Sequence, residues 1–359
     1  MKAVSIIGAR PQFVKEAALQ KQLKLKGIEE VLIHTGQHYD SNMSDVFFDV
    51  LKMDKPKYNL GINGATHGEM TGRMMIELEK IINHENPDIV ILYGDTDSTL
   101  AGAIVASKMN VEIVHIEAGL RQEPKAMPEE TNRVLTDRVA KYLFCPTTRA
   151  IDNLKQENIV ENVVFTGDVM YDVFCQMKNS FEYSLVEKLK LTPNEYIVMT
   201  LHRDFNVDNR DKLESILKQV EIINKQIPIV WPIHPRTKQK IQKFKLEKYI
   251  KGVRIVEPLD YLQLMGLTMK SKCVITDSGG YQKEAYFAKK QAYIIMPDTA
   301  WKELVECEWN TLVDETNLVE LILKENNPKY IEGLYGEGNA VEIICDYLVE
   351  KKDGRSKNE

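Results

Sequence analysis

The chain has 359 residues, of which 43% are hydrophobic and 28% charged, a composition typical of globular proteins. Its length favours two domains, and a formal net charge of -6 excludes a general basic surface, so we expect no nucleic-acid partner. No run approaches the roughly 20 apolar residues that span a bilayer. We therefore expect a cytoplasmic protein with no membrane partner. The five cysteines are scattered without a Cys-x-x-Cys pair, which suggests neither a metal site nor a disulfide framework.

Apolar, β-branched runs alternate with amphipathic segments through the first half of the chain. Strands are expected at residues 3–9, 30–36, 88–95, 112–119, 142–147 and 163–168. Helices are expected at residues 11–26, 67–83 and 97–109. Strands that alternate with helices predict right-handed βαβ units, and therefore a parallel sheet with helices on both faces.

The same alternation resumes in the second half, after a less regular stretch at about residues 172–194. Strands are expected at residues 196–202, 227–234, 253–258, 272–277 and 292–298. The predicted fold class is α/β, with two Rossmann-like domains that face each other across a cleft. We place the first domain at 1–170 and the second at 171–338, with a helix at 339–351 as a candidate to pack back on the first.

Polar side chains gather where these strands end, and such sheets bind ligands at the carboxyl ends of their strands. A single Asp there is often a helix N-cap, and a single His is often satisfied by the backbone. So many at one edge of two sheets favour a functional cleft. The residues concerned are Arg10, His34, His38, Asp95, Glu117, His202, Arg203, His234, Arg236 and Asp277 to Gly280.

The segment "TDSGGYQKEA" (276–285) links an apolar strand to a helix. Ser278 can cap that helix, and Gly279–Gly280 let backbone N–H groups approach an anion within the favourable field of the helix dipole. Glu284 lies one turn later, where it can accept hydrogen bonds from ribose hydroxyls. The segment fits the diphosphate of a nucleotide sugar, although Ser-Gly-Gly alone could equally form a tight turn.

The end of the first strand argues against a bound dinucleotide or ATP. It is followed by "GARPQ" (8–12) rather than G-x-G-x-x-G, and the chain contains no P-loop G-x-x-x-x-G-K-[ST]. We therefore expect no cofactor. Arg10 and Lys15 could instead supply positive charge to a diphosphate from the first domain.

Three acids of the first domain are candidates for proton transfer. Asp95, Glu117 and Glu129 come from neighbouring βα units. Clustered carboxylates push their pKa values apart, so that one can act as a base while another stays protonated. Metal binding is the competing use, but the acids do not share one helix face and a metal would be redundant beside three nearby arginines. N-caps and salt bridges remain the alternative for each acid.

Nine motifs together resemble one family, the non-hydrolysing UDP-N-acetylglucosamine 2-epimerases. The resemblance runs from Met1 to about Tyr347, and the order and spacing of the motifs match that family. The motifs are "GARPQFVK", "HTGQHYD", "YGDTDSTLAGA", "HIEAGLR", "PEETNRVLTD", "TGDVMYD", "TLHR", "HPRT" and "TDSGGYQKEA".

The resemblance implies a GT-B-like fold and an isomerase that inverts carbon 2 of a UDP-activated 2-acetamido sugar. UDP would be eliminated to give a glycal and then re-added, without a redox cofactor. It also implies a homodimer that serves surface polysaccharide biosynthesis; bacterial members can be activated by their own substrate. The catalytic positions would be Asp95, Glu117, Glu129 and His202. The UDP-binding positions would be Arg10, Lys15, His234, Arg236, Ser278, Gly279, Gly280 and Glu284.

The chain departs from the family pattern after the strand that follows Ser-Gly-Gly. Met296 and Trp301 stand where many members have arginines, and Phe205 stands where a Glu is usual. The segment "WKELVECEWN" (301–310) resembles the subgroup that epimerises UDP-2,3-diacetamido-2,3-dideoxyglucuronate. Trp301 and Phe205 are thus candidate substrate-specificity positions.

Three other functions remain as alternatives. A hydrolysing 2-epimerase would release UDP and a free mannosamine-type sugar. A GT-B glycosyltransferase could use the same fold and donor, but no acceptor groove is evident from the sequence. A nucleotide-sugar sensor would lack the three acids, and all three are present.

Overall fold

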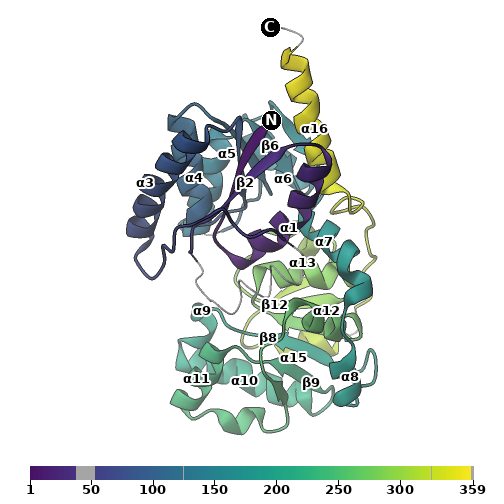
Figure 1. Cartoon of the computed structure of the whole chain (residues 1–359). Helices are drawn as coiled ribbons and strands as arrows, with labels where there is room; N and C mark the ends of the chain where they lie inside the picture. Colours follow the sequence, from purple (N-terminus) through teal and green to yellow (C-terminus); the bar gives the residue numbers. More distant parts are fainter. Residues whose placement is uncertain (38–52, 124, 325, 357–359) are drawn as a thin grey trace. The chain divides into compact units, whose positions relative to one another are not determined.

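The computed structural model describes residues 1–37, 53–123, 125–324 and 326–356. The chain divides into two compact units: unit 1 comprises Met1–Cys175 and Glu332–Glu359, and unit 2 comprises Gln176–Ile331. Each unit contains one sheet whose strands all pair in parallel, with helices between the strands (Figure 1). The predicted α/β fold class is confirmed.

The sheet of unit 1 has seven strands in the order β3-β2-β1-β4-β5-β6-β7. The order reverses between β1 and β4, which is the point where open α/β sheets bind ligands. Tyr93 and Ile116 are register partners at the ends of β4 and β5, so the residues that follow them leave the sheet next to each other. The strands are β1 (Lys2–Ile7), β2 (Glu29–His34), β3 (Tyr58–Asn59), β4 (Ile89–Tyr93), β5 (Glu112–Ile116), β6 (Tyr142–Cys145) and β7 (Val163–Phe165).

Three helices of unit 1 begin at a threonine N-cap. Thr66, Thr96 and Thr147 each accept the N–H of the third residue that follows, which satisfies an otherwise unpaired donor. Figure 1 shows α3 and α4 side by side, and α4 also packs against α5. The helices are α1 (Arg10–Leu25), α3 (His67–Glu85), α4 (Asp97–Lys108), α5 (Pro128–Val139), α6 (Thr148–Gln156), α7 (Val169–Met177) and α16 (Ala340–Ser356).

Helix α16 returns to unit 1 after the chain has completed unit 2, and it packs against α1. The buried carboxylate of Asp172 accepts the N–H of Val341 at 2.8 Å, near the start of the helix. Further along, the ring of Tyr347 makes edge contacts with Tyr142 and Phe144. These contacts fix the C-terminal helix on the N-terminal sheet.

The sheet of unit 2 has six strands in the order β10-β9-β8-β11-β12-β13, which is the same winding with β8 and β11 at the reversal. Its core includes the completely buried Trp231. The strands are β8 (Ile197–Thr200), β9 (Ile229–Pro232), β10 (Arg254–Val256), β11 (Cys273–Thr276), β12 (Gln291–Ile295) and β13 (Asn310–Val313). The helices are α8 (Ser184–Lys188), α9 (Asp204–Val207), α10 (Arg210–Asn224), α11 (Pro235–Phe244), α12 (Tyr261–Met269), α13 (Gly279–Phe287), α14 (Lys302–Glu306) and α15 (Leu318–Leu323).

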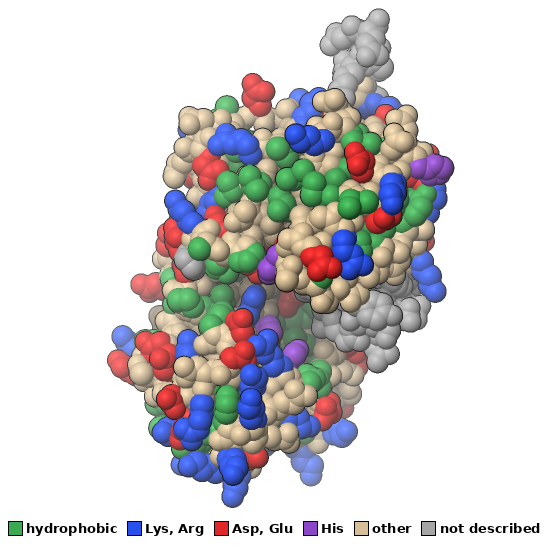
Figure 2. Space-filling model, turned by 90° about the vertical axis from the view of Figure 1, so that its left-hand side faces the viewer, with side chains coloured by type: hydrophobic (Ala, Val, Ile, Leu, Met, Phe, Trp, Pro, Cys, Tyr) green, Lys and Arg blue, Asp and Glu red, His purple; other side chains and the backbone are tan. Residues whose placement is uncertain are grey.

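The surface carries charges of both signs. Figure 2 shows Lys and Arg side chains interspersed with Asp and Glu over the face in view. Within the part of the chain that the structure describes, no helix is long and apolar enough to cross a membrane.

Candidate active site

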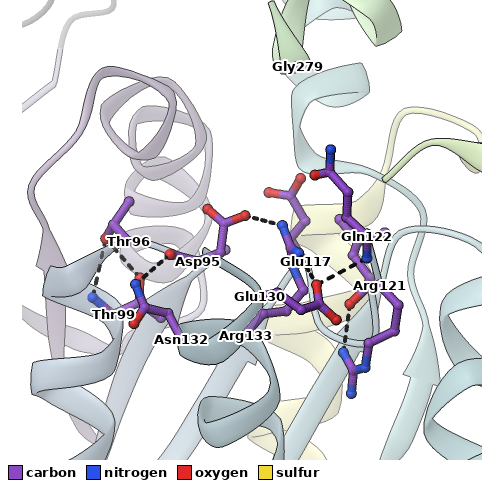
Figure 3. A network of polar contacts seen from close by, with 12 residues as sticks. Asp95, Thr96, Thr99, Glu117, Arg121, Gln122, Glu130, Asn132, Arg133 and Gly279 are labelled. Carbon is purple, nitrogen blue, oxygen red and sulfur yellow. Dashed lines mark hydrogen bonds and ion pairs between the residues drawn. The ribbon is translucent and has the colours of Figure 1, made fainter. Parts of the chain in front are cut away.

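Asp95 and Glu117 follow the paired ends of β4 and β5, and Figure 3 shows both side chains pointing the same way. Glu117 has a φ of +71°, a left-handed conformation that a side chain of this size rarely adopts and that costs about 1–3 kcal/mol. Its N–H and that of Ala118 both donate to the carbonyl of Phe144 at 3.1 Å, which holds the turn in place. Backbone strain of this kind, held by neighbouring strands, is characteristic of functional sites.

Both carboxylates are paired with cations. Glu117 forms an ion pair with Lys15 of α1, and the two side chains are largely buried. Asp95 forms an ion pair with Arg133 of α5, and that guanidinium also pairs with Glu130 (Figure 3). The two acids therefore sit in separate electrostatic surroundings, which is how two neighbouring carboxylates can take different roles in proton transfer.

The third predicted acid, Glu129, lies half-buried in the first turn of α5. Its carboxylate makes no hydrogen bond or ion pair with any residue the structure describes. The next residue, Glu130, is instead the member of the network: it pairs with Arg133 and accepts the N–H of Gln122 at 3.0 Å. Salt bridges are the more plausible sequence-based reading for Glu130 and Arg133 than for Glu129, and the structure pairs those two residues.

Arg10 begins α1, but its side chain lies outside the described residues, as do residues 38–40 of "HTGQHYD", His38 among them. His34 of the same motif is buried, with its ring edge-on to Phe13 at a centroid distance of 4.9 Å. Burial lowers the pKa of His34 to about 4, so its ring is neutral near pH 7. This strand-end histidine is part of the core.

The loop after β1 is closed by a side chain that the sequence did not single out as a site residue. The buried amide oxygen of Gln12 accepts the N–H groups of Gly8 and Ala9 at 2.8 and 3.0 Å. Its amide nitrogen donates to the carbonyl of Tyr93 at 2.8 Å. Two N–H groups that would face a diphosphate in a dinucleotide-binding loop are thus already bound.

In unit 2 the strand-end residue His202 is anchored by Asp277. The fully buried carboxylate accepts the backbone N–H of His202 at 3.0 Å and that of Arg203 at 2.9 Å, and it lies 3.0 Å from Nδ1 of the His202 ring. Asn206 donates to the same carboxylate at 3.1 Å. Burial opposes ionisation of Asp277, but these hydrogen bonds hold the pKa of its carboxyl below the usual value.

His234 lies beside His202, with 5.7 Å between their ring centroids. Nδ1 of His234 accepts the N–H of Arg236 and so caps α11. Burial, together with the nearby His202 and Arg236, lowers the pKa of His234. The guanidinium of Arg236 is bound to Asp208 at 2.6 Å, on the exposed side of α11.

The first turn of α13 is open in the way that an anion site requires. Ser278 stands at the N-cap position with no side-chain cap bond, so its hydroxyl is not used by the helix. A Cβ built on Gly280 would meet no atom within 4 Å, and one built on Gly279 would meet only the guanidinium of Arg203, at 4.0 Å. Nε of Arg203 is buried without a hydrogen-bond partner among the described residues. Arg203 is therefore a further candidate anion ligand, which the sequence had shown only as a strand-end charge.

Trp301 contacts the first turn of α13. Its buried indole donates to the carbonyl of Gly279 at 2.9 Å, and the ammonium group of Lys283 lies 3.8 Å from the ring centroid. Glu284, one turn into α13, is half-buried. Phe205 is 39% exposed at the start of the short helix α9.

The described ranges contain no group of three or more His, Cys, Asp or Glu side chains that could hold a metal ion. What they contain is a pair of neighbouring carboxylates in unit 1 and an uncrowded, cation-lined helix start in unit 2. The first arrangement can move protons, and the second can bind a diphosphate.

Residues 20–349 match the family model for UDP-N-acetylglucosamine 2-epimerase. A UDP-2,3-diacetamido-2,3-dideoxy-D-glucuronate 2-epimerase of Pseudomonas aeruginosa is 43% identical over 98% of this chain and 100% of its own length. A UDP-N-acetylglucosamine 2-epimerase homolog of Methanococcus maripaludis is 41% identical over 97% of this chain and 99% of its own.

Among solved structures, the chain is similar to the UDP-GlcNAc 2-epimerase of Methanocaldococcus jannaschii in complex with UDP-GlcNAc and UDP. The TM-score is 0.87 at 38% identity, covering 98% of this chain and 100% of that one. The similarity extends over both units and confirms the expected GT-B-like fold. This chain belongs to the UDP-N-acetylglucosamine 2-epimerase family.

Proposed function

We propose that this protein epimerises carbon 2 of a UDP-activated 2-acetamido sugar by eliminating UDP and adding it back. A carboxylate removes the proton from C2 while the bond between C1 and the diphosphate oxygen breaks, which leaves a glycal and UDP. The diphosphate oxygen then re-forms its bond to C1, and a proton is delivered to the opposite face of C2. The observation that carries the proposal is that Asp95 and Glu117 follow the paired ends of β4 and β5, each with its own cation.

The residues of the two units divide this reaction between them. Asp95 and Glu117 transfer protons, with Glu129 as the third acid. Lys15 pairs with Glu117 and Arg133 pairs with Asp95, so each acid has a cation of its own beside it during proton transfer. The start of α13, His202 and Arg203 bind the diphosphate while the sugar is detached. Glu284 accepts the ribose hydroxyls, and Arg10, His234 and Arg236 complete the UDP site.

We further propose that the accepted substrates are UDP-N-acetylglucosamine and its 2,3-diacetamido-glucuronate analogue. Support comes from the names of the two relatives above. One is a UDP-N-acetylglucosamine 2-epimerase homolog, and the other is a UDP-2,3-diacetamido-2,3-dideoxy-D-glucuronate 2-epimerase. Trp301 is the residue through which the segment 301–310 acts on substrate choice, because it fixes the Gly279 carbonyl beside the diphosphate site. The enzyme acts in the cytoplasm as a homodimer and supplies a mannosamine-type unit for surface polysaccharide.

The test is to incubate the protein with each UDP-sugar in D2O and follow the sugar by NMR. We expect deuterium to enter at C2, in both the starting sugar and its C2 epimer, with UDP still attached in most molecules. Stoichiometric release of UDP and free sugar would replace the proposal with a hydrolysing enzyme. Failure of C2 exchange with both sugars would overturn the acid–base assignment.

A further inference from the structure

His115 is a completely buried histidine next to the last residue of β5, and both of its ring nitrogens are bound. Nε2 lies 2.8 Å from the carbonyl oxygen of Gly94, and Nδ1 lies 2.7 Å from the carboxylate of Asp137 in α5. The ring therefore bridges the end of β4 and helix α5. His115 and Asp137 both lie in motifs noted in the sequence, "HIEAGLR" and "PEETNRVLTD", but neither was among the candidate site residues.

The partners determine how many protons the ring carries. A backbone carbonyl can only accept, so Nε2 must donate to Gly94. Asp137 is a carboxylate, because it also accepts the N–H of Gly119 at 3.1 Å and the guanidinium of Arg121 at 2.7 Å. Nδ1 must donate to that carboxylate too, and a ring that donates from both nitrogens is an imidazolium. Burial disfavours the charged form of Asp137, but His115 and Arg121 hold the pKa of its carboxyl below the usual value.

The surrounding charges form a closed set. Arg121 also makes two bonds to the carboxylate of Glu157 after α6, at 2.6 and 2.7 Å. Two cations, His115 and Arg121, thus face two anions, Asp137 and Glu157. Both ring nitrogens of His115 and the carboxylate of Asp137 are bound within the protein, which suits a fixed structural link better than a proton donor to substrate.

The atoms that this set holds are those next to the two candidate catalytic acids. The carbonyl bound by Nε2 belongs to Gly94, the residue immediately before Asp95, in a turn with a φ of +59°. The N–H bound by Asp137 belongs to Gly119, two residues after the strained Glu117. One imidazolium–carboxylate pair therefore ties together the two turns from which the acids project.

We propose that His115 is a positioning residue, which fixes the distance between the Asp95 and Glu117 carboxylates through the Gly94 carbonyl and, by way of Asp137, the Gly119 amide. The inference rests on the proposed C2 epimerisation, for which these two acids are the proton-transfer groups. A displacement of about 1 Å in a reacting group can cost about 100-fold in rate. The bond to Gly94 is the one that holds Asp95, so its loss should matter most.

Two substitutions separate the two bonds. In His115→Asn the amide nitrogen takes the place of Nδ1 and keeps the bond to Asp137, but nothing reaches the Gly94 carbonyl. In His115→Gln the amide nitrogen takes the place of Nε2 and keeps the bond to Gly94. We expect kcat for deuterium exchange at C2 to fall about 100-fold in the first variant and about 10-fold in the second. KM for the UDP-sugar and the Kd for UDP should change less than about threefold in both, because the UDP-binding residues are untouched.

Ile82→Ala serves as the control for stability, because Ile82 is a buried core residue of α3 that is not part of the His115 set. It should lower Tm at least as much as His115→Asn yet leave kcat within about twofold. Hydrogen–deuterium exchange of the peptides around residues 93–99 and 116–121 should quicken in His115→Asn and not in Ile82→Ala.

The outcomes distinguish the two proposals. If the wild-type protein exchanges C2 and folded His115→Asn does so at the wild-type rate, the positioning role is overturned and the proposed function stands. Equal losses in the Asn and Gln variants, or a loss of kcat that Ile82→Ala reproduces, would also overturn it. If the wild-type protein exchanges with neither sugar, the proposed function is overturned and this inference with it.

Discussion

Each unit of the molecule contains a histidine paired with a buried aspartate, and the two pairs differ in what they leave open. In unit 1, His115 and Asp137 have fully buried side chains, and every ring nitrogen is used within the protein. In unit 2, Asp277 is fully buried as well, but the side chain of His202 is 35% exposed and only its Nδ1 faces the carboxylate. The same pair of groups is a fixed link in one sheet and an oriented, reachable imidazole in the other.

The polar groups that follow the strands also differ between the two units. Those of unit 1 offer carboxylates that are already matched by Lys15 and Arg133. Those of unit 2 offer N–H groups, the guanidinium of Arg203 and two glycines with open space in front of Gly280. Two sheets of the same winding can thus hold a proton-transfer site and an anion site, because the winding sets only where side chains emerge.

The largest effect is expected from neutralising a carboxylate of unit 1. Asp95→Asn should lower the rate of C2 deuterium exchange by about 1000-fold, because an amide cannot take the proton from carbon. The Kd for UDP, measured by calorimetry, should stay within about threefold. Glu112→Gln, at the amino end of β5, is the matched control and should exchange at the wild-type rate. Weakened UDP binding in Asp95→Asn, with C2 exchange retained, would mean that Asp95 binds UDP and does not transfer the proton.

The next largest effect is expected from the aspartate of unit 2. In Asp277→Asn one acceptor oxygen becomes an amide N–H, which would oppose the N–H of His202 while the remaining oxygen accepts that of Arg203; this should cost about 3 kcal/mol in the free energy of unfolding. The pKa of Asp277 is lowered, so its stabilisation is present above the usual carboxyl pKa and is lost as the pH falls through the folded value. The difference between variant and wild type should therefore shrink on acidification.

The loss of stability in Asp277→Asn can be measured in unit 2 separately from unit 1. All three tryptophans of the chain, Trp231, Trp301 and Trp309, lie in unit 2, so urea unfolding followed by tryptophan fluorescence reports on it. A variant with wild-type stability at pH 8 would show that Asp277 does not organise the turn of His202.

A smaller effect sharpens the assignment of the anion site. Gly280→Ala should leave Tm unchanged or slightly raised, because the added methyl meets no atom within 4 Å. It should weaken UDP binding about 10-fold or more if a diphosphate occupies that space. Gly72→Ala in α3, where a Cβ also meets nothing within 4 Å, is the matched control and should bind UDP normally. Unaltered UDP affinity in Gly280→Ala would exclude close approach of the diphosphate at this residue.

The smallest effect contrasts the buried acids of the two units. Glu16 of α1 is buried, and burial, together with the nearby Glu30, raises the pKa of its carboxyl well above the usual value. Above the usual carboxyl pKa the unfolded chain releases this proton while the folded chain retains it, so stability falls as the pH rises. The shift is opposite in direction to that of Asp277.

Glu16→Gln should therefore stabilise unit 1 at pH 8, by about 1 kcal/mol, and have less effect at pH 5. The measurement is hydrogen–deuterium exchange of peptides that cover β1 and β4 at the two pH values. The amide can still pair with the hydroxyl of Tyr93, which bonds Glu16 in the wild type. Destabilisation that grows with pH would mean that Glu16 is ionised in the folded protein.

Most of the fold followed from the sequence, because buried parallel strands are continuous apolar runs. The two strands that were not predicted are those without such a run: β3 has two residues, and β13 begins with Asn310. The sequence could predict those site residues that directly follow a strand, because the strand ends are visible in it. Asp95 and Glu117, which leave the sheet next to each other, are examples.

What the sequence could not supply are the pairings. The bonds of His115 with Asp137, Gln12 with Gly8, and Trp301 with Gly279 join residues whose meeting depends on helix phase and tertiary packing. His34 illustrates the converse, since a histidine at a strand end is part of the core when its ring packs on Phe13.

The return of α16 to unit 1 also sets an order of events on the ribosome. Residues 176–331 form one contiguous stretch, whereas unit 1 needs both ends of the chain. The surface of α1 that receives α16 is made early and stays uncovered until the whole of unit 2 has been synthesised, while unit 2 can fold as soon as it emerges. Helix α16, which is translated after unit 2, thus completes the unit that was begun before it.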